Sequence, residues 1–364
     1  MSPSTPELLR LRLRDVGPAE EAAWGALAAR AIEANPFFLP GMLLPAARHL
    51  DGGGDAELLV VADGDRWLAC VPVVRRPKFS DLLLPGVRTW NHPYVFLWTP
   101  LVDRDAVDAV ARALVGAPGA WRARAYVALE AIEDGAVARA LLAAPAAGAT
   151  APFVHRTFSR AALRRRPQDD YVTSHLSGKA RRELGRTRRK LAQELGAEPE
   201  LVDASDDDAA FDRFLALEAG GWKGRAGSAL TSDPAHAAFS RDVWADFRGR
   251  GAAHLLELRC GDRATASVLC LRAGDALFAV KIGYDESLRQ GTPGVLLLAD
   301  LATWFHEHTD ADLLDSCAVP DHALINRLWP DRRDLTTLVL PARGPLGRAA
   351  KAFDTRGRAR RDDA

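Results

Sequence analysis

The turn Arg289–Gly294 (RQGTPG) stands directly before a leucine-rich run that is typical of a buried helix. The first N–H groups of a helix have no intrahelical partner and carry partial positive charge, so they can bind a phosphate group. Gly291 and Gly294 leave room for such a ligand, and Pro293 suits a first helical position. Thr292 can cap the helix or donate its hydroxyl. The turn therefore predicts a phosphate or diphosphate site.

Two residues that begin this turn, Arg289 and Gln290, add side-chain donors. The turn lacks the Lys-Ser/Thr pair of a Walker A sequence, and it is not a GxGxxG dinucleotide motif. An ordinary helix start after a tight turn remains the alternative interpretation. Each charge–dipole contact at an exposed helix terminus contributes only about 0.3–1 kcal/mol. Several amides must therefore act together to hold a diphosphate.

A second group of reactive side chains follows in the segment DLLDSCAVPDH, residues 312–322. Asp315, at the end of a short predicted strand, is the preferred base or amine anchor, and His322 is the second candidate because its ordinary pKa lies near 6.5. Asp321 can orient His322 or cap the following helix, and the cap is favoured. Cys317 could carry an acyl group, but a buried core thiol is the preferred interpretation.

Two aromatic and polar clusters are candidates for binding an acceptor. In the loop GGWKGRAG, Trp222 can form a pocket wall, whereas Lys223 and Arg225 can pair with a carboxylate or phosphate; a flexible surface loop is the alternative. In the first half, His92 stands in a cluster whose other members are Trp90, Asn91 and Tyr94. This cluster either faces an interdomain cleft or is structural.

The segment Ser177–Gly196 predicts an amphipathic helix. Apolar residues repeat at about every fourth position on one side, and Gly196 suits the C-terminal cap. The other sides carry cations, opposed only by Glu183 and Glu194. The cations are Lys179, Arg181, Arg182, Arg186, Arg188, Arg189 and Lys190. The helix either presents a solvated face or guides phosphates or another polyanion.

The remaining patterns predict a mixed α/β fold. Residues 57–76 read as a hairpin that turns at Asp63–Asp65, and residues 253–285 read as three strands with turns at Gly261 and Gly274. YVFLWTPLVD is a further strand candidate. Asp233 and Pro234 mark a helix start. Four regions result: residues 1–165, 166–200, 201–345 and a basic, frayed tail at 346–364.

Composition limits the classes of function. The chain has 364 residues and a formal net charge of zero, so it has no global field to attract nucleic acid or an anionic membrane. Its four cysteines form no CxxC pair, which indicates reduced thiols and no structural metal. A signal-peptide core and a membrane-length apolar run are missing from the sequence. A cytoplasmic location without a membrane span is therefore expected.

Several segments, taken in order, resemble the CelD-like, FemAB-related branch of the GNAT acyltransferase superfamily. In the first half they are NPFFLPGMLLPAARHL and WNHPYVFLWTPLVD, followed by SGKARRELGRTRRKLAQELG. In the second half they are EAGGWKGRAGSAL, VKIGYDESLRQGTPGVLLLADL and DSCAVPDHALINRLWPDRR. The resemblance spans most of residues 35–343 and implies two GNAT-like modules in tandem. Each would have a mostly antiparallel, twisted sheet flanked by helices.

The resemblance also implies the roles of individual residues. The second module would hold acyl-CoA, most simply acetyl-CoA, and Ala279–Gly283 would offer backbone amides to the thioester carbonyl. The acyl-CoA-binding residues would be Ile282, Gly283, Arg289, Gln290, Gly291, Thr292, Pro293 and Gly294. The acceptor-binding residues would be His92, Trp222, Lys223, Arg225, Tyr284 and Asp321.

Three functions follow as hypotheses. The first is an acyl-CoA-dependent N-acyltransferase that transfers directly to the amine of a small or sugar-linked acceptor. The second is a Fem-type peptidyltransferase that uses aminoacyl-tRNA. The basic helix favours this hypothesis, although nucleic acid is otherwise not an expected partner. The third is a GNAT-like scaffold without catalysis in polysaccharide assembly.

Overall fold

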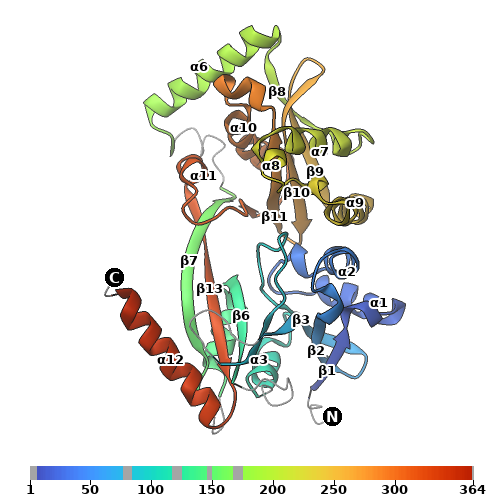
Figure 1. Ribbon diagram of the computed structural model, residues 1–364, viewed down its shortest axis with the longest axis vertical. Helices are drawn as coiled ribbons and strands as arrows, with labels where there is room; N and C mark the ends of the chain where they lie inside the picture. Colours follow the sequence, from blue (N-terminus) through green and yellow to red (C-terminus); the bar gives the residue numbers. More distant parts are fainter. Residues whose placement is uncertain (1–5, 77–83, 117–124, 146–149, 167–174, 363–364) are drawn as a thin grey trace. The chain divides into compact units, whose positions relative to one another are not determined.

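The computed structural model describes residues 6–76, 84–116, 125–145, 150–166 and 175–362 (Figure 1). The chain divides into two compact units. Unit 1 comprises Met1–Phe158 and Asp334–Ala364, and unit 2 comprises Ser159–Arg333. Two long strands, β7 (Phe153–Arg164) and β13 (Asp331–Pro341), each have residues in both units. The expected mixed α/β class with mostly antiparallel sheets is confirmed.

In unit 1 the strands of the sheet lie in the order β1-β2-β3-β4-β6-β13. All neighbouring strands are antiparallel except β4 and β6. The strands other than β13 are β1 (Glu7–Arg12), β2 (Glu57–Asp63), β3 (Arg66–Arg76), β4 (Gly86–Thr89), the short β5 (Leu101–Val102), which pairs with β3, and β6 (Tyr126–Glu133). The helices are α1 (Pro18–Ala28), α2 (Pro40–His49), α3 (Val107–Gly116), α4 (Ala136–Ala143) and α12 (Pro345–Asp362), with short 3-10 turns η1 (Leu13–Asp15), η2 (Pro36–Phe38) and η3 (Gly53–Asp55). The predicted hairpin at residues 57–76 is confirmed as β2–β3.

Two expectations for unit 1 differ from the structure. The segment predicted as a strand from Tyr94 is a strand only at Leu101–Val102. The C-terminal region expected to be frayed forms α12 instead, whose Ala350 is fully buried. The part of β13 from Asp334 onward and α12 belong to unit 1 rather than to unit 2.

In unit 2 the strands of the sheet lie in the order β12-β11-β10-β9-β8. Strand β12 also pairs with residues Ala162–Arg164 of β7. The strands are β8 (Pro199–Asp203), β9 (Ala253–Cys260), β10 (Arg263–Ala273), β11 (Ala276–Tyr284) and β12 (Leu313–Asp315). The helices are α6 (Gly178–Leu195), α7 (Ala210–Gly220), α8 (Trp222–Arg225), α9 (Pro234–Gly249), α10 (Pro293–His308) and α11 (Ala323–Leu328), with 3-10 turns η4 (Leu230–Ser232) and η5 (Glu286–Gly291). The three predicted strands at 253–285 and the helix that starts at Asp233 and Pro234 are confirmed.

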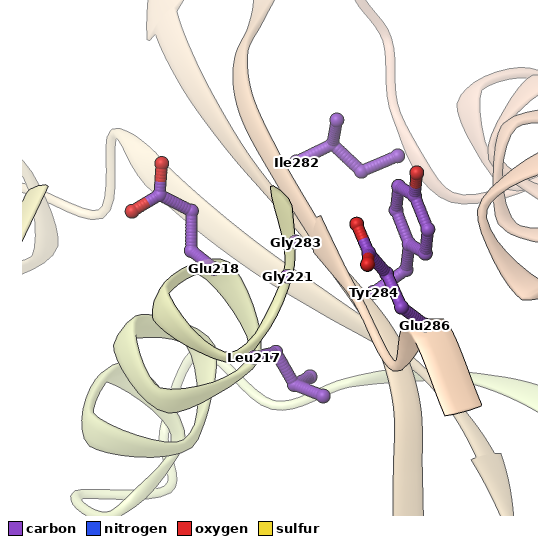
Figure 2. A pocket seen from close by; sticks show the side chains of 7 residues that line it. All are labelled: Leu217, Glu218, Gly221, Ile282, Gly283, Tyr284 and Glu286. Atoms are coloured by element: carbon purple, nitrogen blue, oxygen red, sulfur yellow. The ribbon is translucent and has the colours of Figure 1, made fainter. Parts of the chain in front are cut away.

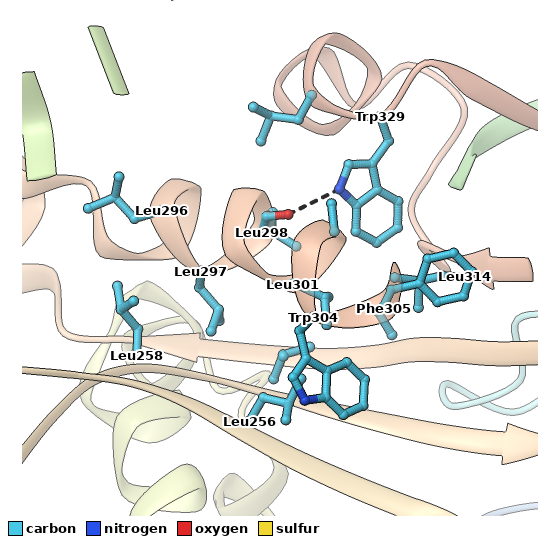
Figure 3. Packing of buried hydrophobic residues seen from close by; sticks show 14 of the residues in the cluster. Leu256, Leu258, Leu296, Leu297, Leu298, Leu301, Trp304, Phe305, Leu314 and Trp329 are labelled. Carbon is cyan, nitrogen blue, oxygen red and sulfur yellow. Dashed lines mark hydrogen bonds between the residues drawn. The ribbon is translucent and has the colours of Figure 1, made fainter. Parts of the chain in front are cut away.

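The core of unit 2 is built around α10. Leu297, Leu301 and Phe305 of α10 are fully buried in a cluster that includes Leu256 of β9 (Figure 3). Trp329 covers the same helix and donates its indole N–H to the carbonyl of Leu298 at 3.1 Å (Figure 3). Burying a large apolar side chain contributes about 1.5–3 kcal/mol. The first turn of α10 is therefore held on a rigid support.

Among the described residues, no helix has both the length and the hydropathy that crossing a bilayer requires. All four cysteines are free and buried.

Candidate functional site

The turn before α10 has an unusual backbone. The 3-10 turn η5 ends at Gly291, Thr292 adopts the left-handed conformation (φ 42°, ψ 54°), and α10 starts at Pro293. A β-branched residue with positive φ is uncommon, and such strain costs about 1–3 kcal/mol and often marks a functional site. The side chain of Thr292 makes no capping hydrogen bond.

The main-chain donors of this turn are available to a ligand. The carbonyl of Thr292 accepts hydrogen bonds from the N–H groups of Val295 (2.9 Å) and Leu296 (3.2 Å). The N–H groups of Thr292 and Gly294 form no hydrogen bond within the described part of the chain. Both donors stand at the positive end of the α10 dipole, which suits an anion.

The two glycines of the turn also have packing reasons. A Cβ atom at Gly291 would lie 3.0 Å from Cδ1 of Leu191, on the neighbouring helix α6. A Cβ atom at Gly294 would lie 3.2 Å from the ring of Tyr284. The sequence pattern suggested only space for a ligand, whereas the structure shows that the glycines also let α6 and Tyr284 approach the turn.

The parallel strands β11 and β12 separate before β11 reaches the turn, which Tyr284, at the end of β11, approaches. They pair only through three residues, of which Phe278 and Asp315 form the last pair, and β11 then continues alone on this side to Tyr284. On its other side, the register with β10 changes so that Val280 has no partner, which is a β-bulge. A bulge leaves the extra residue outside the ladder and bends the strand. The segment Ala279–Gly283 thus has backbone groups free of pairing with β12.

Asp315 lies at the centre of a buried cluster of charges. Its side chain is 0% exposed, and Oδ2 accepts from Arg160 at 2.7 Å and from Arg333 at 2.9 Å. Its Oδ1 accepts the N–H of Cys317 at 2.8 Å. Burial acts to raise the pKa of Asp315, but the two guanidinium groups outweigh it and hold the pKa below its usual value. This environment suits an ion-pair anchor for β12 better than a proton acceptor.

The other residues of the segment 316–322 are placed differently. Cys317 is buried, and burial raises its thiol pKa well above the ordinary range, which favours the core-thiol interpretation over an acyl carrier. His322 is exposed and caps α11, since its Nδ1 accepts the N–H of Ile325 at 3.4 Å. The cap expected of Asp321 is therefore made by His322, and Asp321 is exposed beside it.

A small pocket lies between the end of α7 and the end of β11 (Figure 2). Its empty space is about 190 Å³ including the open mouth, which suits a small group rather than a whole ligand. Arg225, predicted to bind an acceptor, pairs with Glu286 at 2.6 Å. The side chains of Trp222 and Lys223, like that of Arg289, lie outside what the structure describes. The lining residues are Leu217, Glu218, Gly221, Ile282, Gly283, Tyr284 and Glu286.

Glu218 is a buried carboxylate that the sequence analysis missed. Its side chain is fully buried, its Oε2 accepts the N–H of Leu230 at 2.7 Å, and its Oε1 lies 3.1 Å from Nζ of Lys281. Figure 2 shows the carboxylate on the α7 side, directed away from Glu286. Glu218 therefore fastens α7 to β11. The signal was present, because Glu218 continues the apolar face of Phe211 and Phe214, where a charge is unexpected.

The predicted sites are thus only partly brought together. Unit 2 collects the turn before α10, the splayed end of β11, Tyr284 and the loop after α7. His92 lies in unit 1, where it is buried with its ring centroid 5.0 Å from that of Trp90. Within the described residues, no group of three or more His, Cys, Asp or Glu side chains gathers to hold a metal.

Comparison with known proteins agrees with this geometry. Residues 178–317, which lie within unit 2, match the model of the acetyltransferase (GNAT) domain. No curated protein matches the chain.

Among solved structures, the C-terminal domain of a putative lysylphosphatidylglycerol synthetase from Agrobacterium fabrum is similar, with 12% identity, TM-score 0.54 and coverage of 92% of this chain and 94% of that one. FemX is similar at 10% identity and TM-score 0.54, over 94% of this chain and 99% of that one. At these identities the likeness shows the fold alone. The chain therefore shares the fold of FemX and of the synthetase domain.

Proposed function

We propose that this protein is an acyl-CoA-dependent N-acyltransferase of the CelD-like, FemAB-related branch. Acetyl-CoA is the simplest donor, and the acceptor is the amine of a small or sugar-linked molecule. The observation that carries the proposal is the pair of N–H groups at Thr292 and Gly294, which form no hydrogen bond with the described residues. They lie close to Tyr284, at the end of β11 that β12 does not pair, and in the second half of the chain, where residues 178–317 match the GNAT model.

The residues around the turn fit an acyl-CoA donor. The diphosphate would accept hydrogen bonds from the first turn of α10, with Gln290 beside it. The backbone of Ala279–Gly283, bent by the bulge at Val280, would donate to the thioester carbonyl as negative charge develops there. The acceptor would enter from the loop after α7, where the pocket beside Tyr284 receives a small group.

Transfer then needs one proton acceptor and no enzyme nucleophile. The neutral amine attacks the thioester carbon, the C–S bond breaks, and the departing thiolate takes up a proton. His322 is the better candidate to accept the amine proton, directly or through water, because its side chain is exposed. Asp315 is assigned to position β12, since both of its oxygens are engaged within the buried cluster.

Isothermal titration with acetyl-CoA and with CoA tests the donor site. We expect Thr292→Asp to weaken binding by about tenfold or more, because its carboxylate repels the diphosphate, and Thr292→Asn to weaken it less. The two variants are matched, since Asn and Asp both tolerate the left-handed conformation and both cap helices well. Absence of binding by the unmodified protein at millimolar ligand, or equal affinity in the two variants, would refute the donor assignment.

The Fem-type hypothesis remains the second candidate because the chain shares the FemX fold and carries the basic helix α6. The two hypotheses differ in the donor consumed. Incubation with acetyl-CoA and an amine panel should release free thiol, whereas incubation with aminoacyl-tRNA should release free tRNA. Thiol release that depends on an added amine supports the first hypothesis, and tRNA deacylation that depends on an acceptor supports the second.

A further inference from the structure

The exposed side of α6 carries a continuous line of cations. Lys179, Arg182, Arg186, Arg189 and Lys190 follow one another at intervals of one to four residues, which places them on one side of a helix with 3.6 residues per turn. We call these five residues the basic row. Arg181 lies about 100° around the helix from Arg182 and is outside the row.

The opposite side of α6 is fixed in the core of unit 2. Leu191 is fully buried, and Leu184 and Leu195 pack against the same core cluster. The helix contacts η5, α10 and β8 (Figure 1). The basic row is consequently held on a rigid surface, facing away from the core.

Most of the charge in the basic row is not neutralised by the described residues. Arg186 pairs with Glu183 at 2.6 Å, and Lys190 hydrogen-bonds the neutral side chain of Gln290. Lys179, Arg182 and Arg189 are exposed and form no ion pair with the described residues. Like charges at i and i+4 destabilise a helix. An external anion would relieve this repulsion.

The basic row also ends at the candidate diphosphate site. Lys190 contacts Gln290, and Leu191 packs against Gly291 of the turn before α10. At its other end, the pKa of Glu183 is lowered chiefly by Arg186, and to a smaller extent by Lys179 and by Arg327 of α11. Positive charge thus extends from α11 along α6 to the turn.

The length of the row decides what kind of anion fits. From Lys179 to Lys190 the helix rises about 16 Å, at about 1.5 Å per residue. A single terminal phosphate on a small ligand can reach only one or two of these cations. A chain of regularly spaced phosphates can contact all of them at once.

We propose that the basic row binds the phosphate backbone of a polynucleotide strand, without reading its bases. Phosphate contacts position a protein but carry no sequence information. A membrane surface is the less suitable partner, because an interfacial helix inserts its apolar face, and that of α6 is buried in the core. The proposal does not depend on which donor the GNAT domain uses.

Fluorescence anisotropy with a fluorescein-labelled oligouridylate of about 20 nucleotides, long enough to span the row, tests this surface on the full chain. If five cations contact phosphates, log K should fall with log salt at a slope of about −3.5, which is about a hundredfold between about 50 and 200 mM NaCl. Arg182→Gln/Arg189→Gln should make the slope shallower by about 1.4. The matched control is Arg181→Gln/Arg241→Gln, which removes the same charge outside the row.

The control variant should keep the slope of the unmodified protein, and all proteins should unfold at similar temperatures because the substituted side chains are exposed. Equal losses in the row variant and the control, or no binding in about 50 mM NaCl, would overturn the proposal. The proposal would also be overturned if the protein sedimented with phosphatidylglycerol vesicles but did not bind oligouridylate. The basic row would then be assigned to a lipid surface. Excess CoA should not change the binding of oligouridylate or of vesicles. This result would exclude the phosphates of CoA as the ligand of the basic row.

Discussion

Asp315→Asn is expected to lower the free energy of unfolding of unit 2 by about 3–5 kcal/mol, because it leaves two buried guanidinium groups without their counter-charge. Arg160 is 4% exposed and Arg333 is 1% exposed, so water cannot replace the carboxylate. These arginines stand near the two ends of unit 2, where the chain enters at Ser159 and leaves at Arg333. Asp315 thus ties both ends to β12. Urea unfolding at neutral pH measures the loss.

The sign of the pH dependence follows from the same cluster. The folded protein holds the pKa of Asp315 below the ordinary value of about 3.9, so its stabilising contribution is complete above that value. It is lost as the pH falls through the lower, folded pKa. At neutral pH the substitution therefore removes the whole contribution.

Asp300→Asn is the matched control for this substitution. Asp300 pairs with Arg188 across α6 and α10, but both side chains are partly exposed, so the pair should contribute about 1 kcal/mol or less. Suppose that Asp315→Asn is as stable as Asp300→Asn but no longer releases thiol from acetyl-CoA. That result would contradict the assignment of Asp315 as a structural anchor. It would return Asp315 to the position of catalytic base.

The elements of unit 2 were predictable because their boundaries are local. Ser177 caps α6 by accepting the N–H of Ala180, and Gly196 ends it in the left-handed conformation (φ 72°). Asp233 accepts the N–H of Ala235 at the start of α9. Such signals depend on residues within one turn of each other, so the sequence alone can show them.

The two wrong predictions in unit 1 concern segments whose structure depends on residues far away in the sequence. The segment after Tyr94 has the residue types of a strand, but the amide of Asn35 donates to the carbonyls of Leu97 (3.2 Å) and Thr99 (2.7 Å) and replaces strand pairing there. The basic C-terminal region packs as α12 with Ala350 in a core cluster of unit 1 and with Asp354 2.7 Å from Nδ1 of His155. Neither partner could be assigned from spacing in the sequence.

The candidate site shows the same division. Position Asp315 was identified correctly as the end of a strand, yet its partners lie 155 and 18 residues away in the chain, so its ion pairs were hidden. The basic helix and the Gly-rich turn were interpreted separately. Only the fold shows that Leu191 packs against Gly291.

Acidification is expected to destabilise unit 1 through His92. Burial lowers the pKa of His92 to about 3, whereas an exposed histidine titrates near pH 6.5. Between these values the unfolded chain binds a proton that the folded chain does not, so stability is complete above about pH 6.5 and falls below it. At about 1.4 kcal/mol per pH unit, the loss by about pH 4.5 amounts to about 2–3 kcal/mol.

The comparison with His92→Phe isolates this effect. Phenylalanine cannot titrate, and it keeps an aromatic ring against Trp90. The comparison is needed because burial raises the pKa of Glu130, also in unit 1, to about 6, which stabilises the folded protein as the pH falls and so acts in the opposite direction. Urea unfolding at about pH 7.5 and 4.5 should show a smaller acid loss in the variant by about 2–3 kcal/mol.

An equal acid loss in both proteins would show that His92 takes up a proton while folded, and that its surroundings accept a cation. The expected result has a consequence for binding. A histidine that stays neutral at physiological pH can offer a hydrogen bond to an acceptor molecule but cannot pair with its carboxylate or phosphate. Toward any group that reaches it, His92 is therefore limited to hydrogen bonding and ring packing.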